Sequence, residues 1–359
     1  MREDRFEVGS EFHWFDDWPT DGDPLPWPDD APIFATGRGT IAALVPPGGT
    51  RPRLHVPSYF CHDAAVGASA HFDLAIYRHL PGQGGPDLDT LTTRPGDWVL
   101  AANLFGAEDG AAWVGWRRSH DVVLIEDHTH DPFSAWARAT AADYAFASLR
   151  KTLPIPDGAV LWSPLGLELP PVGDPAPGGP AKLEAMLLKR AYLRGAPISR
   201  DSYRSLQIAG EGLLRTDLGG RASFVARELL HSARPWSWPT RRKQNVRRFL
   251  RRMEADAPEG IAPLFATWPH GGAPFAAILV CDNAPRRESL RRFLIDRRIF
   301  ATVHWPIPAG SDPLYAEAGD LSSRLLTVPL DQRYSPDDVD RVIEVVLAHG
   351  DRPALADVP

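Results

Sequence analysis

Residues 122–130 read VVLIEDHTH, an apolar run that ends in charged and polar side chains. Other runs are equally short and apolar on both faces, namely Trp98–Ala102, Tyr144–Ala147 and Ala159–Trp162. This pattern is typical of strands buried on both sides in a mostly parallel sheet. Helix-like stretches alternate with the runs, so the sequence predicts an α/β fold with a large, doubly wound sheet.

The composition excludes several classes of protein. The chain has 359 residues, 43% of them hydrophobic, and a formal net charge of -7. Its apolar runs are far shorter than the roughly 20 residues of a membrane-spanning helix, so we expect no membrane association. Mild acidity argues against a general nucleic-acid binder, which needs basic residues to neutralise phosphates. Two distant cysteines, Cys61 and Cys281, and the lack of a charged-then-apolar leader favour a reducing cytoplasm.

Shifts in composition predict three parts of the chain. They are an irregular N-terminal arm at residues 1–32, a large domain at 33–235 and a smaller C-terminal α/β domain at 236–359. Helical patterns at 181–194 and 204–231 end at the Trp-Ser-Trp-Pro breaker, residues 236–239, where we place the boundary.

The last helix has a well-marked start. Ser335 is the expected N-cap, Pro336 occupies the first helical position, and Asp338 lies three residues after the cap. This is a capping-box arrangement, in which each side chain binds the backbone N–H of the other residue.

Lysine chemistry has few candidates in this chain. Only four of its 39 basic residues are lysines, namely Lys151, Lys182, Lys189 and Lys243, and arginine cannot form a Schiff base. Lys182 and Lys189 are predicted on the solvated face of a helix, and Lys243 lies in a run of arginines. Lys151 follows an apolar run and precedes a proline-stiffened turn, which predicts a buried amine. Burial lowers the pKa of a lysine, and the neutral amine is the form that attacks a carbonyl.

Two other features accompany Lys151. The loop TGRGT, residues 36–40, leads into a helix-like stretch, where backbone N–H groups and the helix dipole favour an anion. Asp127 emerges at the carboxyl end of a predicted strand, where open α/β sheets bind ligands. Each feature alone is commonly structural. Together, an anion cradle, an acid and a buried amine are what pyridoxal 5'-phosphate (PLP) requires for its phosphate, pyridine nitrogen and aldehyde.

At these residues the sequence resembles the fold-type I PLP-dependent enzymes, and among them the DegT/DnrJ/StrS family of nucleotide-sugar aminotransferases. The resemblance extends from about residue 34 to residue 349. Its matching segments are GT at 39–40, VPSY at 56–59, NLFG at 103–106, IEDHTH at 125–130, DYAFASLRK at 143–151 and LTVPL at 326–330.

The resemblance implies a role for each matching residue. Lys151 would hold PLP as a Schiff base and move a proton, Asp127 would keep the pyridine nitrogen protonated, and His130 would lie beside the phenolic oxygen. The implied phosphate-binding residues are Gly39, Thr40, Arg38 and Ser148. The family's aromatic stacking position falls on or near Cys61, so Phe60 or Tyr59 would stack on the cofactor ring instead. Asn103 is the remaining implied cofactor-binding residue. No metal site is implied.

The implied function is a PLP-dependent aminotransferase that acts as a homodimer. It would move an amino group from an amino-acid donor to a keto group, most simply on a nucleotide-linked sugar. The small-molecule donor and keto substrate are then its partners, together with the second subunit, because the family builds each site from two chains.

Three other interpretations stay open. The first is a PLP-dependent enzyme of specialised metabolism that acts on a non-sugar metabolite, with or without transamination. It is favoured by the three-residue gap from Ser148 to Lys151, where the family usually has five, by the turn PDGA at 156–159, and by the missing Asn-Tyr-Arg motif.

The other two belong to different classes. A nucleic-acid-binding protein would use the basic helices at 241–252 and 286–298, although apolar residues alternate with these charges as on ordinary solvated faces. A metal hydrolase would use His128 and His130, but no further ligand pair follows at a completing distance.

Overall fold

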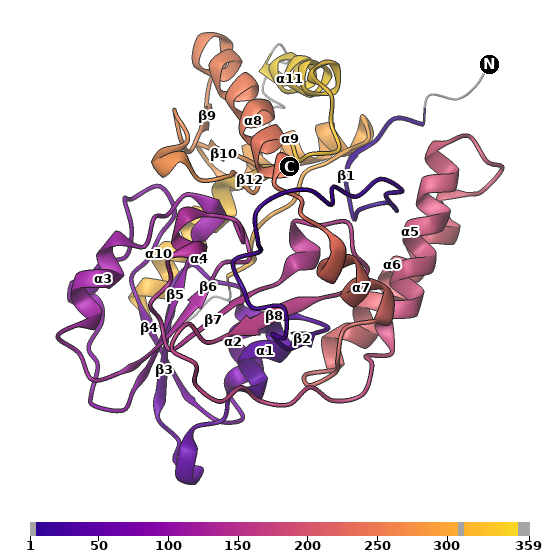
Figure 1. Cartoon of the computed structure of the whole chain (residues 1–359). Helices are drawn as coiled ribbons and strands as arrows, with labels where there is room; N and C mark the ends of the chain where they lie inside the picture. Colours follow the sequence, from indigo (N-terminus) through magenta and orange to yellow (C-terminus); the bar gives the residue numbers. More distant parts are fainter. Residues whose placement is uncertain (1–4, 308–311, 351–359) are drawn as a thin grey trace.

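A computed structural model describes residues 5–307 and 312–350 of the chain. Its centre is a seven-stranded sheet with the order β2-β8-β7-β6-β5-β3-β4 (Figure 1). The strands are β2 (Ile33–Phe34), β3 (Arg53–Pro57), β4 (Asp73–Tyr77), β5 (Trp98–Ala102), β6 (Val123–Asp127), β7 (Tyr144–Ala147) and β8 (Ala159–Trp162). From β3 to β7 all neighbours are parallel, and β8 is antiparallel to β7 and β2. The predicted α/β class with a mostly parallel sheet is confirmed.

Both faces of this sheet are buried. Its helices are α1 (Gly37–Ala43), α2 (His62–Ala68), α3 (Ala111–Arg117), α4 (Ala135–Arg138) and α7 (Phe224–Ser232). In β5, Leu100 packs in the cluster that contains α1 and α2, whereas Val99 and Ala101 pack in the cluster that contains α3 and α4. Consecutive strand residues point to opposite faces. The continuous apolar runs in the sequence therefore follow from helices on both sides of the sheet.

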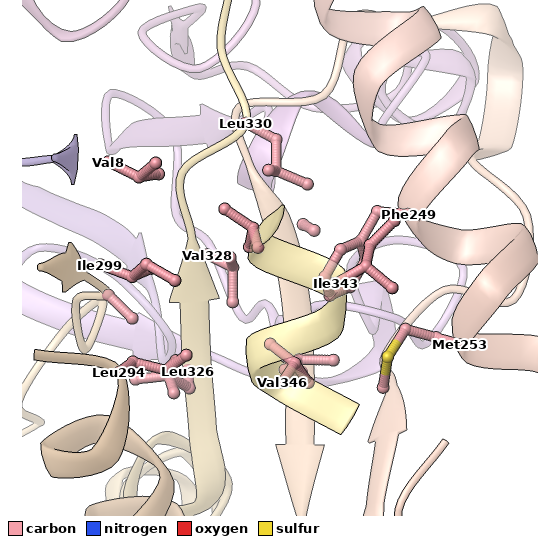
Figure 2. Close-up of a cluster of buried hydrophobic side chains, with 14 of the residues drawn as sticks. Val8, Phe249, Met253, Leu294, Ile299, Leu326, Val328, Leu330, Ile343 and Val346 are labelled. Atoms are coloured by element: carbon pink, nitrogen blue, oxygen red, sulfur yellow. The ribbon is translucent and has the colours of Figure 1, made fainter. Parts of the chain in front are cut away.

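A second, antiparallel sheet lies in the C-terminal part of the chain. It has the order β12-β10-β9, from β9 (Ile261–Pro263), β10 (Ala277–Cys281) and β12 (Leu325–Val328). The helices after residue 236 are α8 (Ser237–Asp256), α9 (Ala284–Asp296), α10 (Pro313–Arg324) and α11 (Pro336–Gly350). Figure 2 shows Phe249 of α8, Val328 of β12 and Ile343 of α11 in one hydrophobic cluster. No helix within the described ranges is both long and apolar enough to cross a membrane.

The predicted start of α11 is confirmed. The Ser335 Oγ accepts a hydrogen bond from the Asp338 N–H at 3.2 Å, and the Asp338 carboxylate accepts one from the Ser335 N–H at 2.9 Å. The two residues thus satisfy each other's free backbone donors.

Two predicted helix limits are wrong. The stretch 204–231 forms two helices, α6 (Arg200–Thr216) and α7, because the Asp217 carboxylate binds the N–H groups of Gly219 and Gly220 and turns the chain. The predicted breaker is part of α8, with Pro239 in its first turn. Proline is tolerated there because the first N–H groups of a helix have no partner within the helix.

Lys182 and Lys189 are not solvated, contrary to the sequence prediction. Both lie on α5 (Gly178–Leu193), which pairs with α6 in the hairpin at the right of Figure 1. The Nζ of Lys189 lies 2.6 Å from Glu7, and the two side chains are 1% and 4% exposed. The Nζ of Lys182 lies 2.5 Å from Glu11. The amphipathic pattern was misleading because the N-terminal arm covers the polar face of this helix.

The arm links distant parts of the chain. Its strand β1 (Val8–Gly9) pairs in parallel with β11 (Ile299–Phe300), and the Gly9 N–H donates to the Tyr334 hydroxyl at 2.7 Å. Val8 packs in the cluster of Figure 2. Because Glu7 and Glu11 bind α5, the arm joins the α5–α6 hairpin to the C-terminal sheet.

The substitution Glu7→Gln should destabilise the protein by about 3 kcal/mol, because it leaves the buried Lys189 ammonium without its counter-charge. The control is Asp16→Asn, which breaks the contacts of a 38% exposed carboxylate with Arg190 and Arg194 and should cost less than about 1 kcal/mol. Urea unfolding measures both. Equal effects of the two substitutions would show that the arm is not held by the buried pair.

Candidate active site

The carboxyl ends of β5, β6 and β7 meet the start of α1 at a cavity of about 300 Å³. Strand-end residues that line it include Asn103, Asp127, Ser148 and Lys151. Residues from the C-terminal part, among them Phe275, His304 and Trp305, close it from the other side. Open α/β sheets bind ligands at this edge, because parallel strands and the loops that follow them converge there.

Lys151 ends a single 3-10 turn, Leu149–Lys151, directly after β7. Its N–H donates to the Ser148 carbonyl at 3.1 Å, and its side chain is exposed to the cavity. The positive charge of Arg150 and, next, burial lower the pKa of Lys151 to about 8. A fraction of the amine is therefore neutral at physiological pH, which is the state required of a nucleophile.

The neighbouring Arg150 is fixed by a carboxylate. Its two terminal nitrogens lie 2.8 and 2.9 Å from the carboxylate oxygens of Glu211 on α6. Burial alone would raise the pKa of Glu211, but the charges of Arg150 and Lys182 outweigh burial and hold this pKa well below its usual value. The pair therefore stays ionised beside Lys151, and Glu211 itself lines the cavity.

The turn after Lys151 is held by Asp157. This buried carboxylate accepts hydrogen bonds from the Ser223 hydroxyl at 2.6 Å and the Ser223 N–H at 2.9 Å, at the start of α7. Gly158 next to it donates to the Ala35 carbonyl at 2.8 Å with a φ of +131°, a conformation that favours glycine. The Pro-Asp-Gly turn, a departure from the family pattern that lies within the proline-stiffened stretch after Lys151, thus positions the lysine segment.

Asp127 and Asn103 lie on adjacent strand ends. The Asp127 Oδ1 accepts a hydrogen bond from the Thr129 N–H at 2.8 Å, and burial raises the pKa of Asp127. The Asn103 N–H donates to the Asp127 carbonyl at 3.0 Å. Asn103 Oδ1 accepts from the Glu108 N–H, but its buried Nδ2 has no hydrogen-bond acceptor among the described residues. An unsatisfied donor in a cavity lined by an acid indicates that a polar ligand belongs there.

His130 is held as a neutral imidazole. Its Nδ1 accepts a hydrogen bond from the Phe105 N–H at 2.9 Å, so the ring proton is assigned to Nε2. The ring stacks on Phe105 and on Trp305, with interplanar angles of 2° and 13°. Burial first, and then the charges of His304, Lys151 and Arg242, hold the pKa of His130 well below its usual value.

His128 lies away from the cavity. Its Nε2 is 3.0 Å from the Glu126 carboxylate, and its ring stacks on Trp162, whereas Asp127 and His130 line the cavity. The two histidines therefore do not form a pair. Among residues 5–307 and 312–350, no group of three or more His, Cys, Asp or Glu side chains is arranged to hold a metal ion.

The start of α1 is arranged differently from the sequence prediction. Thr36 is its N-cap and accepts a hydrogen bond from the Gly39 N–H at 3.0 Å, while the Thr40 hydroxyl donates to the Gly37 carbonyl at 2.7 Å. Gly39 and Thr40 are therefore engaged within the helix, and neither lines the cavity. Thr36, Gly37 and Arg38 do line it.

Gly37 faces Ser148 across this end of the cavity. A Cβ at Gly37 would lie 2.9 Å from the Ser148 Cβ, closer than real side chains approach. The Arg38 guanidinium donates one N–H to the Arg215 carbonyl on α6 at 2.9 Å, but its buried Nε has no acceptor among the described residues. Arg38 therefore offers an unsatisfied side-chain donor as well as its backbone to this end of the cavity.

The aromatic wall also differs from the expectation. Phe60 and Cys61 line the cavity, whereas Tyr59 is buried behind it and donates its hydroxyl to the His304 carbonyl. Trp305 completes the wall, 6.1 Å from the Phe60 ring. Sequence analysis missed Trp305 because only the fold brings the segment after β11 to the strand ends.

Comparisons with known proteins bear on the fold. Neither protein-family models nor curated proteins give a match to the sequence. Among solved structures, Spr1654 of Streptococcus pneumoniae, described as a sugar aminotransferase in its PMP form, has a TM-score of 0.63 at 15% identity and covers 96% of this chain and 98% of its own. The chain has the fold of this aminotransferase.

Two further structures agree with this aminotransferase fold. DesV of S. venezuelae, solved with a ketimine intermediate, has a TM-score of 0.59 at 19% identity over 90% of this chain and 85% of its own. DesI, solved with its TDP-sugar product, has a TM-score of 0.58 at 15% identity over 89% and 81%. The predicted fold-type I class is confirmed by these similarities.

Lys151 should react as an amine with a pKa near 8. Labelling by an amine-reactive reagent, followed by mass spectrometry of the Lys151 peptide, should be half-maximal near pH 8, because only the neutral amine reacts. An ordinary lysine would give about 10.4. Arg150→Gln removes the main cause of the lowered pKa and should raise the midpoint by about one unit. The exposed Arg247→Gln is the control; a wild-type midpoint near that of an ordinary lysine contradicts the assigned environment.

Proposed function

We propose that the chain is a PLP-dependent aminotransferase that moves an amino group from an amino-acid donor to a keto group, most simply on a nucleotide-linked sugar. The observation that carries the proposal is that one cavity combines the Lys151 amine, the Asp127 carboxylate and the neutral His130. The aminotransferase folds of Spr1654 and of DesI, the latter solved with a TDP-sugar, support the choice of reaction and substrate.

The residues of the cavity fit PLP. The unsatisfied Nδ2 of Asn103 offers a donor, and the absence of a side chain at Gly37, whose Cβ would lie 2.9 Å from that of Ser148, lets the start of α1 approach Ser148 closely. PLP supplies an electron sink that stabilises negative charge at the donor's α-carbon. The N–H groups of Gly37 and Arg38, which as the first of α1 have no partner within the helix, would bind the phosphate with the Ser148 hydroxyl, in place of the predicted Gly39 and Thr40.

Three side chains would perform the chemistry. Lys151 would hold the aldehyde and, once freed by the donor's amine, would carry the proton that leaves the donor's α-carbon to the cofactor's C4' carbon. A pKa near 8 suits both roles, because the amine must alternate between its two protonation states. Asp127 would keep the pyridine nitrogen protonated, and the Nε2–H of His130 would donate to the phenolic oxygen.

The walls of the cavity would bind the ring and exclude water. Phe60 covers one side of the cavity, and Phe275 and Trp305 come from the C-terminal part of the chain. Exclusion of water strengthens the electrostatic interactions of Lys151 and Asp127.

The proposal includes a cytoplasmic homodimer. Apolar side chains are exposed on helices that also contribute to the cavity: Val66 on α2, and Ile208 and Leu213 on α6. A second copy that covers them would bury apolar surface and close the cavity. Cys61 and Cys281 are both free, which agrees with a reducing compartment.

Incubation of the PLP-loaded protein with L-glutamate tests the reaction. Chromatography of the released cofactor should show conversion to pyridoxamine 5'-phosphate. Lys151→Ala should abolish the conversion, and Asp127→Ala should slow it by about 100-fold or more, because each removes a group that moves or holds a proton. Arg247→Gln should leave it unchanged. A wild-type protein that retains PLP but aminates it with none of the common amino acids is not an aminotransferase.

A further inference from the structure

A second cavity of about 530 Å³ adjoins the first. Its walls come from arm residues 9–12, the α5–α6 hairpin, the start of α8 and the region between β10 and β12. Lys151, Glu211 and His304 line both cavities. A molecule that reacts at Lys151 can therefore extend into this second space, which we call the arm cavity.

The arm cavity is strongly basic. Eight Lys or Arg residues line it, against three Asp or Glu. Several of these cations are already paired. The pairs at hydrogen-bond distance are Arg150–Glu211, Lys182–Glu11, Arg333–Asp331 and Arg291–Glu288.

Two arginines of this wall have no carboxylate partner within the described residues. Arg242 on α8 is 4% exposed, and its guanidinium donates only to neutral oxygens, those of Gln332 at 2.7 Å and Thr152 at 2.6 Å. Arg204 on α6 donates to the Gln207 amide oxygen at 3.3 Å. Arg242 makes no direct ion pair: burial lowers its pKa to about 10, and the charges of Asp331 and Asp131 oppose this. An anion in the cavity would give its guanidinium a direct partner.

The position of Arg242 connects it to the reacting group. Arg242 and Lys151 are both close enough to His130 for their charges to lower its pKa. Guanidinium groups bind carboxylate and phosphate through two parallel hydrogen bonds, which an ammonium group cannot provide. An anionic group at Arg242 would thus lie in the same enclosed space as the Lys151 amine.

We propose that Arg242 and Arg204 form an anion-binding subsite that holds a carboxylate or phosphate of the substrate whose other end reacts at Lys151. The inference rests on the proposed function and deepens it, because it assigns the substrate class: a molecule with a carboxylate or phosphate remote from the reacting carbon. The arm takes part, since residues 9–12 close the cavity and are anchored through Lys182 and Arg333.

Two sources share this chemistry: the side-chain carboxylate of an acidic amino donor and the phosphate of an acceptor. Calorimetric titration of the PLP-loaded protein with glutarate and, separately, with inorganic pyrophosphate distinguishes them, because neither probe carries an amine or a keto group. At least one should bind. Arg204→Gln and Arg242→Gln should each weaken that binding about tenfold or more, the loss of one strong charged contact.

Two further variants serve as controls. Arg247 lies on the exposed side of α8, so Arg247→Gln should bind the probe like the wild type. Arg242→Lys keeps the charge without the bidentate geometry and should retain part of the affinity, even if Arg242→Gln unfolds. Arg204 is exposed, so its substitution should leave the circular dichroism spectrum unchanged.

Each outcome of the titrations either assigns the subsite or rejects it. Binding of glutarate assigns the subsite to the donor, and binding of pyrophosphate assigns it to the acceptor. The inference is overturned if neither probe binds, or if binding is unaffected by both Arg204→Gln and Arg242→Lys. The absorbance of bound PLP, recorded on the same samples, tests the proposed function separately: PLP without anion binding rejects only the subsite, and anion binding without PLP rejects the cofactor.

Discussion

The positive charge of Arg150 beside the Lys151 amine is the interaction on which the rest of the site depends. Two adjacent cations in one turn repel each other, and this repulsion, followed by burial, lowers the pKa of Lys151 to about 8. Glu211 neutralises the charge of Arg150 through two hydrogen bonds, which stabilises the pair of adjacent cations. Lys151 has no carboxylate at ion-pair distance among the described residues.

Glu211 is itself positioned from a distance. It lies on α6, which packs against α5, and α5 is bound to the arm through Lys182 and Lys189. The arm then pairs with β11 of the C-terminal part. The electrostatics of one lysine therefore depend on segments from both ends of the chain, and the same segments enclose the two cavities.

The features that could be predicted from the sequence are those set by residues close together along the chain. Strands β5, β7 and β8 were predicted to the residue, because each is a short apolar run buried on both faces. Strands β3 and β4 were not, since RLHVP and DLAIY include charged residues near the sheet edge. Lys151, Asp127 and His130 follow strand ends directly, so their order along the chain already placed them at one edge.

The site residues that sequence analysis missed or misplaced depend mostly on contacts between segments far apart in the chain. Glu211 and Trp305 reach the cavity only through the packing of the α5–α6 hairpin and of the chain after β11. Lys182 and Lys189 were taken for surface residues because no local pattern indicates that the arm covers them. Gly39 and Thr40 lie two positions further into α1 than Gly37 and Arg38, a distinction that depends on which residue serves as its N-cap.

The most direct test of the account identifies the lysine that PLP modifies. Borohydride reduction of the PLP-incubated protein, followed by digestion and mass spectrometry, fixes the cofactor permanently to its amine. The account predicts a single modified peptide that carries Lys151, and no modified peptide after Lys151→Ala. A label on Lys182 or Lys189, whose side chains are both buried, or no label at all, would contradict it.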